Sequence, residues 1–439
     1  MPKRRREPET ARIDTVTHDG RGIAAVSGKK VFVAGALAGE KVRFMRRKSR
    51  RNFDEAELLE VLEPSAARIE ARCEAFGRCG GCSLQHIADD QQRQIKFQTL
   101  QDNLERIGRV EPEAWLAPIT GPIWHYRRRG RLAVKDVSAK GRVLVGFRER
   151  HAPFITDMHR CEVLAQPVDG MLDALSEMIG HLSISSRLPQ IEVAVAENAV
   201  ALVFRVLDAP TPADEAVLCA FARTHNLRVY LQSGGLDTVA LLYPQGAIEP
   251  LHYSLPEFDL RIKFDPLGFV QINDEINRRM VSAAVELLDP GSDDRVLDLY
   301  CGIGNFSLPL ARRAGTVLGV EGDSLLVTAA IDNAQSNDLT NVSFRRAELD
   351  AIDGSEAWIK EGWDRVLLDP ARSGAAEVVR HMRTLAPGRI VYVSCHPGTL
   401  ARDANTLVNE QGYCLQAAGI IDMFPHTAHV ESIAVFHKR

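Results

Sequence analysis

Short runs of alternating apolar and polar residues fill the N-terminal part of the chain, and glycine-containing turns such as 18–22 (His-Asp-Gly-Arg-Gly) separate them. Alternation with a period of two is typical of strands that bury one face. Five such runs occur: Ile13–Thr17, Ile23–Val26, Lys30–Val33, Lys41–Arg47 and Phe53–Val61. Five short strands in so short a segment predict a small OB-like barrel, which we place at residues 1–66.

The pattern changes after this barrel. Residues 63–90 are loop-like and rich in Cys and Gly, and a helix is predicted over residues 91–107. Helices are predicted near 166–181 and 213–224, among six further strands: Arg129–Val134, Val143–Phe147, Ile191–Ala196, Val200–Val206, Val229–Gln232 and Thr238–Tyr243. These elements predict a central, antiparallel α+β domain over residues 67–265 that includes the Cys-rich loop.

From residue 266 the strands become continuous apolar runs separated by helix-length segments: Arg295–Leu299, Val317–Val320, Arg365–Leu368 and Ile390–Val393. Strands buried on both faces read in this way. They predict a doubly wound, Rossmann-like α/β domain with a mostly parallel sheet over residues 266–439. No apolar run is long enough to span a bilayer and none follows the basic N-terminus, so we expect no membrane association and a cytoplasmic protein.

Charge is distributed unevenly along the 439 residues. The net charge is −4, yet residues 1–52 contain 15 Lys and Arg against 5 Asp and Glu. This asymmetry favours a basic appendage that brings an acidic enzyme body to nucleic acid, although a solvated tail would look the same. Residues 41–51 hold seven basic residues and one Phe. They are either an RNA-facing strand or an edge strand kept basic against aggregation.

A glycine-rich loop follows the first strand of the predicted parallel sheet. Asp298 precedes Gly302 and Gly304, and the second strand ends at Glu321, where a carboxylate can accept both hydroxyls of a ribose. Ser307 takes the place of a third glycine, and a carboxylate at position 298 would repel a pyrophosphate. The loop therefore favours S-adenosylmethionine, while a nicotinamide dinucleotide or a chance Gly-x-Gly remain alternatives.

Two further strand ends carry reactive groups. Cys395 ends the strand that begins at Ile390, and Asp369 ends the preceding one in Asp-Pro-Ala-Arg372, which lacks the aromatic residue typical of amino-group methylation. A thiolate that adds to C6 of uracil makes C5 nucleophilic toward a sulfonium methyl group, and a base must then remove the C5 proton. Glu431, before the last apolar run, is the candidate base. The rival bases are His429 and His396, and Cys395 could instead be a small core residue.

Four cysteines suggest a metal centre. Three lie in the Cys-rich loop, and 78 residues separate the third from the fourth: Cys73, Cys79, Cys82 and Cys161. Such a set fits tetrahedral zinc or a [4Fe–4S] cluster, and the single fourth Cys favours iron–sulfur, with a structural role. Cys219, Cys301 and Cys414 have no partners in the sequence and are expected to be core or loop thiols.

Together these motifs resemble the bacterial 23S rRNA (uracil-5-)-methyltransferases, of the larger type with an N-terminal TRAM domain and an iron–sulfur centre. The resemblance covers nearly the whole chain and rests on these segments: 18–24, the four cysteines, 269–273, 298–307, 369–372, 394–395 and 429–431. Two positions depart from the family pattern. His396 replaces an Asn that usually follows the nucleophilic Cys, and His18 replaces a Tyr in the TRAM turn.

The resemblance implies a role for each motif. Cys395 would be the nucleophile, Glu431 the base, and Phe269 would stack on the flipped-out uracil. S-Adenosylmethionine would be bound at positions Gln271, Tyr300, Asn305, Glu321, Glu348 and Asp369. The four cysteines would hold the [4Fe–4S] cluster. The partner would be 23S rRNA, gripped by the TRAM barrel and modified at uridine 1939, and no obligate protein partner is inferred.

The alternatives keep part of this scheme. The same chemistry could act on another rRNA uridine or on tRNA, although the tRNA-modifying relative lacks both the TRAM domain and the cluster ligands. A non-catalytic RNA-binding or ribosome-assembly factor is the second alternative. It would be expected to have lost Cys395 or the loop at Gly302, and both are present.

Overall fold

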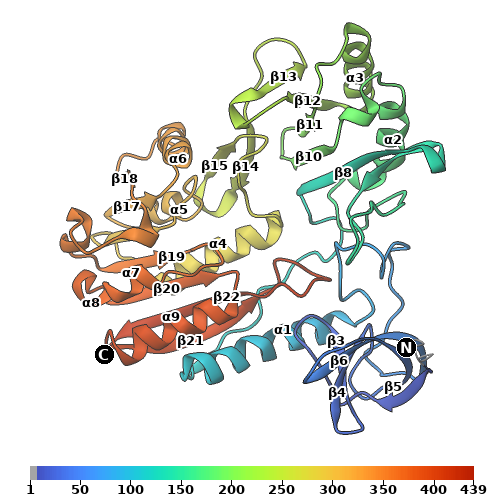
Figure 1. Ribbon diagram of the computed structural model, residues 1–439. Coiled ribbons are helices and arrows are strands. Elements are labelled where there is room, and N and C mark those ends of the chain that lie inside the picture. The colour runs from blue at the N-terminus through green and yellow to red at the C-terminus, as the bar shows by residue number, and fades with distance from the viewer. Residues whose placement is uncertain (1–6) are drawn as a thin grey trace.

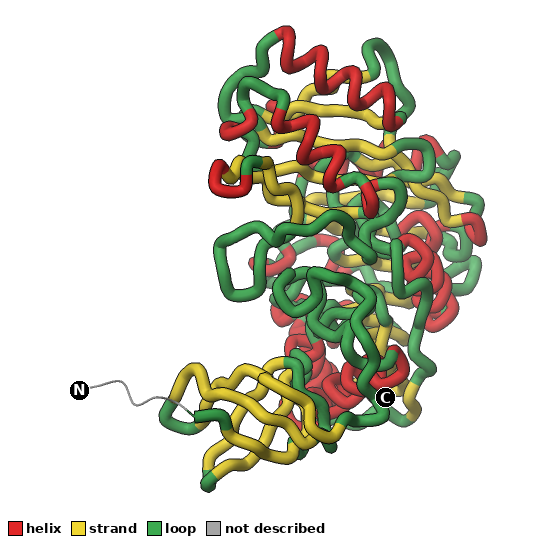
Figure 2. Tube along the Cα trace, turned by 90° about the vertical axis from the view of Figure 1, so that its right-hand side faces the viewer, coloured by secondary structure: helices red, strands yellow, loops and turns green. Residues whose placement is uncertain are grey.

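The N-terminal strands form a small, strongly curved sheet in the computed structural model, which describes residues 7–439 (Figures 1 and 2). Residues 1–6, the start of the predicted basic tail, lie outside the described residues. The strands are β1 (Glu9–Arg12), β2 (Thr15–Val16), β3 (Arg21–Val26), β4 (Lys29–Ala34), β5 (Lys41–Ser49) and β6 (Phe53–Glu63), in the order β1-β5-β6-β4-β3-β2. The prediction of a small barrel is confirmed in its coarser form, as a curved sheet whose end strands β1 and β2 do not pair with each other in the described structure.

The basic segment Lys41–Arg51 lies mostly in β5, which is hydrogen-bonded to β1 on one side and β6 on the other. The interpretation as an edge strand is therefore wrong. Acidic residues of β6 face the basic residues of β5: Arg43 pairs with Glu60, and Arg46 pairs with Asp54. Much of the positive charge seen in the sequence is thus neutralised within the sheet.

The central sheet contains β8 (Arg129–Val137), β9 (Arg142–Gly146), β10 (Gln190–Val195), β11 (Val200–Arg205), β12 (Leu227–Gln232) and β13 (Val239–Tyr243). Two helices accompany it, α2 (Leu172–Gly180) and α3 (Pro212–His225). The order is β13-β12-β11-β10-β8-β9, and β11 pairs with β12 in parallel. The prediction of an antiparallel sheet is wrong at this pair, because α3 provides the crossover that a parallel connection requires.

The C-terminal sheet has the order β18-β17-β16-β19-β20-β22-β21-β7 (Figure 1). Its strands are β7 (Ala114–Trp115), β16 (Arg295–Leu299), β17 (Thr316–Glu321), β18 (Val342–Arg346), β19 (Arg365–Leu368), β20 (Arg389–Ser394), β21 (Tyr413–Ile421) and β22 (Glu431–Lys438). The strands from β18 to β20 are parallel, and β22 is antiparallel to β20. The predicted doubly wound, mostly parallel sheet is confirmed.

Both faces of this sheet are buried. Neighbouring residues such as Val391 and Tyr392 belong to separate apolar cores, which explains the continuous apolar runs in the sequence. The helices are α1 (Asp89–Asn103), α4 (Asp274–Leu288), α5 (Ser307–Ala311), α6 (Ser324–Ser336), α7 (Ala376–Arg380), α8 (Met382–Leu385) and α9 (Pro397–Asn409), and a two-stranded sheet pairs β14 (Leu251–Leu255) with β15 (Leu260–Phe264). Helix α1 and β7 lie against the C-terminal sheet although they precede the central strands. The three domain boundaries stay predictions.

Among residues 7–439, no helix is both long and apolar enough to cross a membrane.

Candidate active site

Cys395 and Glu431 lie opposite each other across two neighbouring strands. Strands β20 and β22 are antiparallel, and Ser394 is paired with Ser432. The next residue outward is therefore Cys395 on the β20 side and Glu431 on the β22 side. Asp369 follows the end of β19, the parallel neighbour of β20. The three groups predicted at separate strand ends are thus brought to one edge of the sheet, at the carboxyl ends of its parallel strands.

Burial dominates the electrostatics of this edge. Burial and the charge of Asp369 together raise the pKa of Glu431 to about 8, and burial with the charges of Glu431 and Asp369 raises the pKa of Cys395 to about 11. Burial likewise raises the pKa of Asp369 to about 7. Arg372 opposes the rise at Cys395 and Glu431. Its place three residues after Asp369 in the sequence could have identified it as a candidate that favours the thiolate.

The two rival bases have different surroundings. His429 is exposed, and its Nδ1 lies 3.4 Å from Nη2 of Arg372, on the rim of the cavity that also contains Cys395. His396 is the N-cap of α9, where its Nδ1 accepts the N–H of Thr399 at 3.2 Å. Asn is a preferred N-cap residue, so His396 takes over the capping that the family's Asn would provide. The choice between Glu431 and His429 stays open here.

The glycine loop and Glu321 form a backbone cradle. Gly302 and Gly304 both have positive φ, and a side chain at Gly302 would extend into open space. The carboxylate of Glu321 accepts the N–H of Gly302 at 3.1 Å and the N–H groups of Gly322 and Asp323 at 2.8 and 3.0 Å. These bonds fix the carboxylate beside the loop, where sequence analysis placed the acceptor for ribose hydroxyls.

Asp298 is fully buried behind this loop. Its Oδ2 accepts the hydroxyl of Ser307 at 2.5 Å, while Oδ1 has no hydrogen-bond partner among the described residues. Burial raises its pKa to about 8, and Asp369 and Glu321 add to the rise. An unpaired buried acceptor costs free energy, so this oxygen is suited to a cationic ligand such as the amino group of a methionine moiety.

The other residues expected at the cofactor have mixed surroundings. Tyr300 has a left-handed backbone (φ 64°), and its hydroxyl lies 3.5 Å from Asp350. The amide of Asn305 exchanges hydrogen bonds with Asn277 and accepts a hydrogen bond from the hydroxyl of Tyr253. Most of the hydrogen-bonding capacity of this amide is therefore already used. Glu348 is exposed and pairs with Arg346. Its carboxylate would meet a side chain placed at Gly322, which puts it next to Glu321.

A cavity of about 800 Å³ opens over the edge of the sheet that carries Cys395 and Glu431. Phe269 and Gln271 line it together with Cys395 and Glu431, and Phe269 is 69% exposed, as expected for a ring that stacks on a ligand. Arg128 holds the segment that carries both residues, since it donates to the carbonyl of Gln271 at 3.0 Å and pairs with Asp274 at 2.6 Å. The basic run at 127–131 in the sequence therefore serves partly to anchor this wall.

The four predicted ligand thiols gather in one apolar cluster around a small cavity of about 20 Å³. Burial raises the pKa of Cys82 to about 12 and that of Cys161 to about 11, and in each case the other thiols add to the rise. Burial also raises the pKa values of Cys73 and Cys79. The 78-residue gap between the third and fourth cysteines is thus closed by the fold.

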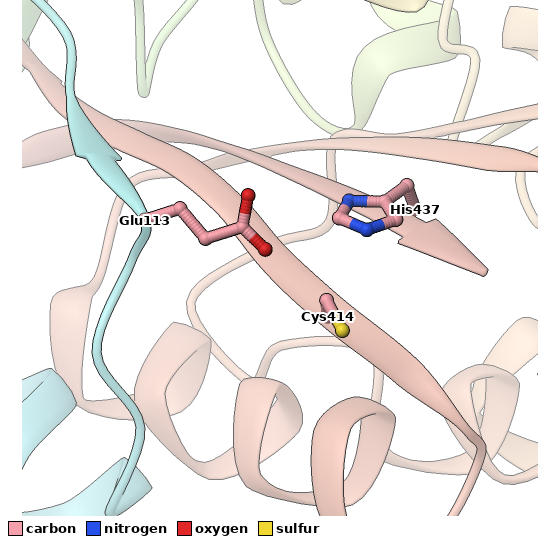
Figure 3. Close-up of side chains that lie close together, drawn as sticks. All are labelled: Glu113, Cys414 and His437. Atoms are coloured by element: carbon pink, nitrogen blue, oxygen red, sulfur yellow. The ribbon is translucent and has the colours of Figure 1, made fainter. Parts of the chain in front are cut away.

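One further group of ligand-type atoms lies near the other end of β22. Figure 3 shows Glu113, Cys414 and His437, whose ligand atoms all lie within 4.8 Å of one another. Cys414 and His437 are direct cross-strand partners. Arg439 donates its Nε–H to the sulfur of Cys414 at 3.3 Å, so a cation already contacts this thiol.

Comparisons with known proteins identify relatives of this chain. The tRNA (Uracil-5-)-methyltransferase family profile matches residues 254–439. The 23S rRNA (uracil(1939)-C(5))-methyltransferase RlmD of Methylococcus capsulatus is 50% identical over 432 residues, covering 98% of this chain and 97% of the relative. The enzyme of the same name from Nitrosococcus oceani is 50% identical over 443 residues, covering 100% and 98%.

A solved structure has the same fold. The tRNA (uracil-54, C5)-methyltransferase of Pyrococcus abyssi, in complex with S-adenosyl-L-homocysteine, superposes with a TM-score of 0.75 at 24% identity and covers 98% of this chain and 100% of that one. At this identity the likeness concerns the fold alone. Because the identity to the curated relatives is far higher and extends over nearly their full length, this chain belongs to the RNA (uracil-5-)-methyltransferase family.

Proposed function

We propose that this protein transfers the methyl group of S-adenosylmethionine to C5 of uridine 1939 in 23S rRNA. The observation that carries the chemistry is the pairing of Cys395 with Glu431 across β20 and β22, beside the cradle formed by Gly302 and Glu321. The curated relatives, which match over nearly the whole chain, carry this substrate in their names. Transfer to tRNA, to another rRNA uridine, or a non-catalytic role is less well supported.

The chemistry divides between the two opposed residues. The thiolate of Cys395 forms a bond to C6 of the uracil, and the electron pair of the C5–C6 double bond makes C5 nucleophilic. S-Adenosylmethionine supplies an electrophilic methyl group to that carbon. Glu431 then takes the C5 proton, the C5–C6 double bond re-forms, and the Cys395–C6 bond breaks to release the thiolate.

The raised pKa values fit a site that becomes reactive on loading. Burial and two neighbouring carboxyl groups keep the Cys395 thiol protonated in the free enzyme. A bound sulfonium cation would add positive charge to a poorly solvated site and so favour both the thiolate and the carboxylates. Arg372 contributes in the same direction.

Cofactor contacts follow from the positions described above. Glu321 would accept the ribose hydroxyls, and the unpaired oxygen of Asp298 would accept the methionine amino group. Gln271 lines the cavity over Cys395, where Phe269 would stack on the base, and Asp369 follows the end of the neighbouring strand β19. The contacts at Tyr300, Asn305 and Glu348 remain proposals from family resemblance.

The four buried thiols are proposed to hold a [4Fe–4S] cluster. The four thiols line one small cavity, three of them from a single loop and the fourth from a distant part of the chain. A [4Fe–4S] cluster takes one thiolate on each of its irons, and this donor set supplies that number.

The wider setting of the protein is also a proposal. The N-terminal sheet would grip RNA backbone through the basic residues that its own acids leave available, and the reaction would take place in the cytoplasm.

The decisive experiment is transfer of labelled methyl from S-adenosylmethionine to unmodified 23S rRNA, followed by nucleoside analysis and site mapping. The proposal predicts 5-methyluridine at position 1939. Label at another rRNA uridine or only in tRNA would leave the chemistry in place and overturn the substrate. An absence of transfer to any RNA by a protein that binds S-adenosylmethionine would overturn the proposed activity.

A further inference from the structure

Helix α1 places a lysine on its buried face, where the proposed reaction does not use it. Lys96 is 1% exposed, and its Nζ donates to Oδ1 of Asp422 at 2.6 Å and to the carbonyl of Phe424 at 2.8 Å. Taking two charges out of water costs several kcal/mol per ion, and apolar residues of similar size would pack at least as stably. A buried pair at this position therefore needs an explanation other than stability.

The pair lies next to the proposed base. Ile421 and Glu431 are register partners between β21 and β22, and Asp422 is the residue that follows Ile421. Four groups face Glu431, and they come from three segments: Lys96 on α1, Cys395 after β20, and Asp369 and Arg372 after β19. Burial and Asp369 disfavour its charged form, whereas Lys96 and Arg372 favour it.

The connection between β21 and β22, which carries Asp422, is held by hydrogen bonds from two other segments. Gln92, one turn before Lys96, accepts the backbone N–H of His426 at 2.9 Å. The amides of Ser83 and Leu84, beside the thiol cluster, both donate to the carbonyl of His426 at 2.9 and 3.0 Å. In Figure 1 this connection extends from the large sheet toward the N-terminal part of the chain. A pair fixed in this way cannot relax toward solvent, which is what lasting electrostatic support requires.

We propose that Lys96, held in place by Asp422, is a positioning residue that favours the ionised form of Glu431, which is the form that can take the C5 proton. This inference rests on the proposed role of Glu431 as the base. In the step concerned, the C5–H bond breaks, its proton moves to a Glu431 oxygen, its electrons form the C5–C6 double bond, and the Cys395 thiolate leaves C6. A protonated Glu431 cannot carry out this step.

The test measures the breakdown of the covalent enzyme–RNA adduct as a function of pH, on full-length protein with unmodified 23S rRNA and S-adenosylmethionine. Two variants remove the cation. Lys96→Gln keeps amide donors for the same acceptors, and Lys96→Met combined with Asp422→Asn also removes the unpaired partner charge. If the midpoint of the profile rises by about one unit, breakdown at pH 7 slows about tenfold and recovers at high pH.

The controls separate charge from packing. Lys96→Arg should restore the wild-type midpoint. Lys140→Met with Asp157→Asn removes a lysine–aspartate contact of 2.5 Å in the central region and should leave the profile unchanged. A fall by the same factor at every pH would show that Lys96 is only structural and would overturn the proposal. An unchanged midpoint in both Lys96→Gln and the Lys96→Met, Asp422→Asn double variant would also overturn the proposal.

Failure of the underlying mechanism gives a different result. Glu431→Gln is measured in the same assay and should accumulate adduct at all pH values. If it instead turns over normally, Glu431 is not the base, and both the proposed mechanism and the inference about Lys96 fall. If Glu431→Gln accumulates adduct while the Lys96 variants keep the wild-type profile, only the inference about Lys96 falls.

Discussion

Thiols at two places in the molecule have pKa values that burial raises, and the comparison between these places shows what the neighbouring groups add. At the end of β20, Cys395 has a raised pKa and faces Glu431, Asp369 and Arg372 at the edge of an open cavity. In the central cluster, Cys82 and Cys161 also have raised pKa values, but their surroundings are mainly apolar residues and the other thiols.

The difference lies in the neighbours rather than in the sulfur. Burial disfavours the thiolate in both places, so neither site holds a reactive anion at rest. Near Cys395 the charge of the thiolate can be balanced by Arg372 and by a cationic ligand. In the central cluster Arg127 lines the cavity and favours the thiolate of Cys79, and a metal would supply the remaining positive charge. The first arrangement suits a nucleophile and the second suits a set of ligands.

The largest effect is expected when the nucleophile is removed. Cys395→Ala should lower methyl transfer by on the order of 10⁴-fold or more, because no other group can add to C6. Binding of S-adenosylmethionine, measured by calorimetry, should stay within about twofold, since the cradle at Gly302 is intact. Cys301→Ala, which alters a buried thiol of the same loop region, is the matched control and should keep activity. Substantial transfer by Cys395→Ala would rule out the covalent route.

The next largest effect should follow loss of the proton acceptor. Glu431→Gln should slow turnover by about 10²–10⁴-fold, the usual range for general base catalysis, and leave protein bound to RNA on a denaturing gel. In the unaltered enzyme, adduct breakdown should rise with pH up to about 8 and then level off, because burial raises the pKa of Glu431 to about 8. If His429→Ala, rather than Glu431→Gln, stops breakdown, the base is the histidine.

Loss of the central ligands should act on stability first. Cys82→Ser, or removal of the metal by oxidation and chelation, should lower Tm by at least about 5 °C, since 1 kcal/mol shifts Tm by about 2–4 °C in domains of 150–250 residues. Cys219→Ser, at a half-buried thiol outside the cluster, should have little effect. Activity should fall in parallel, because Ser83 and Leu84 hold His426 in the segment before Glu431. An unchanged Tm in iron-free protein would contradict a structural cluster.

A smaller effect is expected when Asp298 is replaced by Asn: the folded protein should lose less stability as the pH rises, whereas its binding of S-adenosylmethionine should become weaker. The pKa of Asp298 is raised to about 8 in the folded protein. At pH values between the pKa of this group in the unfolded chain and its pKa in the folded protein, unfolding releases a proton. The ionisation of Asp298 therefore lowers the stability of the folded protein as the pH rises through that range. Asp298→Asn keeps the bond from Ser307 and should flatten the decline in Tm between pH 5 and 8. The substitution should also lower the affinity for S-adenosylmethionine about tenfold.

Measuring Tm as a function of pH, with and without S-adenosylmethionine, checks the predicted effects on stability and on cofactor binding. An unchanged affinity in Asp298→Asn would show that the unpaired oxygen does not meet the methionine amino group.

Strand positions and the ends that carry chemistry were predictable because buried parallel strands are continuous apolar runs that stop at a loop. Cys395, Asp369 and the loop at Gly302 were found in this way. The partner of β20 was not predictable, because pairing depends on contacts remote in sequence. Only the structure shows that β22 inserts antiparallel beside β20 and brings Glu431 directly opposite Cys395.

The same reason explains the misses. The basic character of β5 was visible in the sequence, but the acids of β6 that neutralise Arg43 and Arg46 are cross-strand neighbours. Lys96 gave no signal at all, because a lysine in a polar helix is normally exposed and only tertiary packing buries it. The parallel pairing of β11 with β12 was likewise hidden in an ordinary strand–helix–strand pattern.

The central claim is that the sulfur of Cys395 bonds to C6 of the target uracil. The most direct measurement uses 23S rRNA fragments that contain 5-fluorouridine at position 1939, because fluorine at C5 cannot be removed as a proton and the adduct should persist after methyl transfer. After nuclease and protease digestion, mass spectrometry should place a methylated fluorouridine on the peptide that contains Cys395. A trapped adduct on any other residue, or no adduct although unmodified RNA is methylated, would contradict the account.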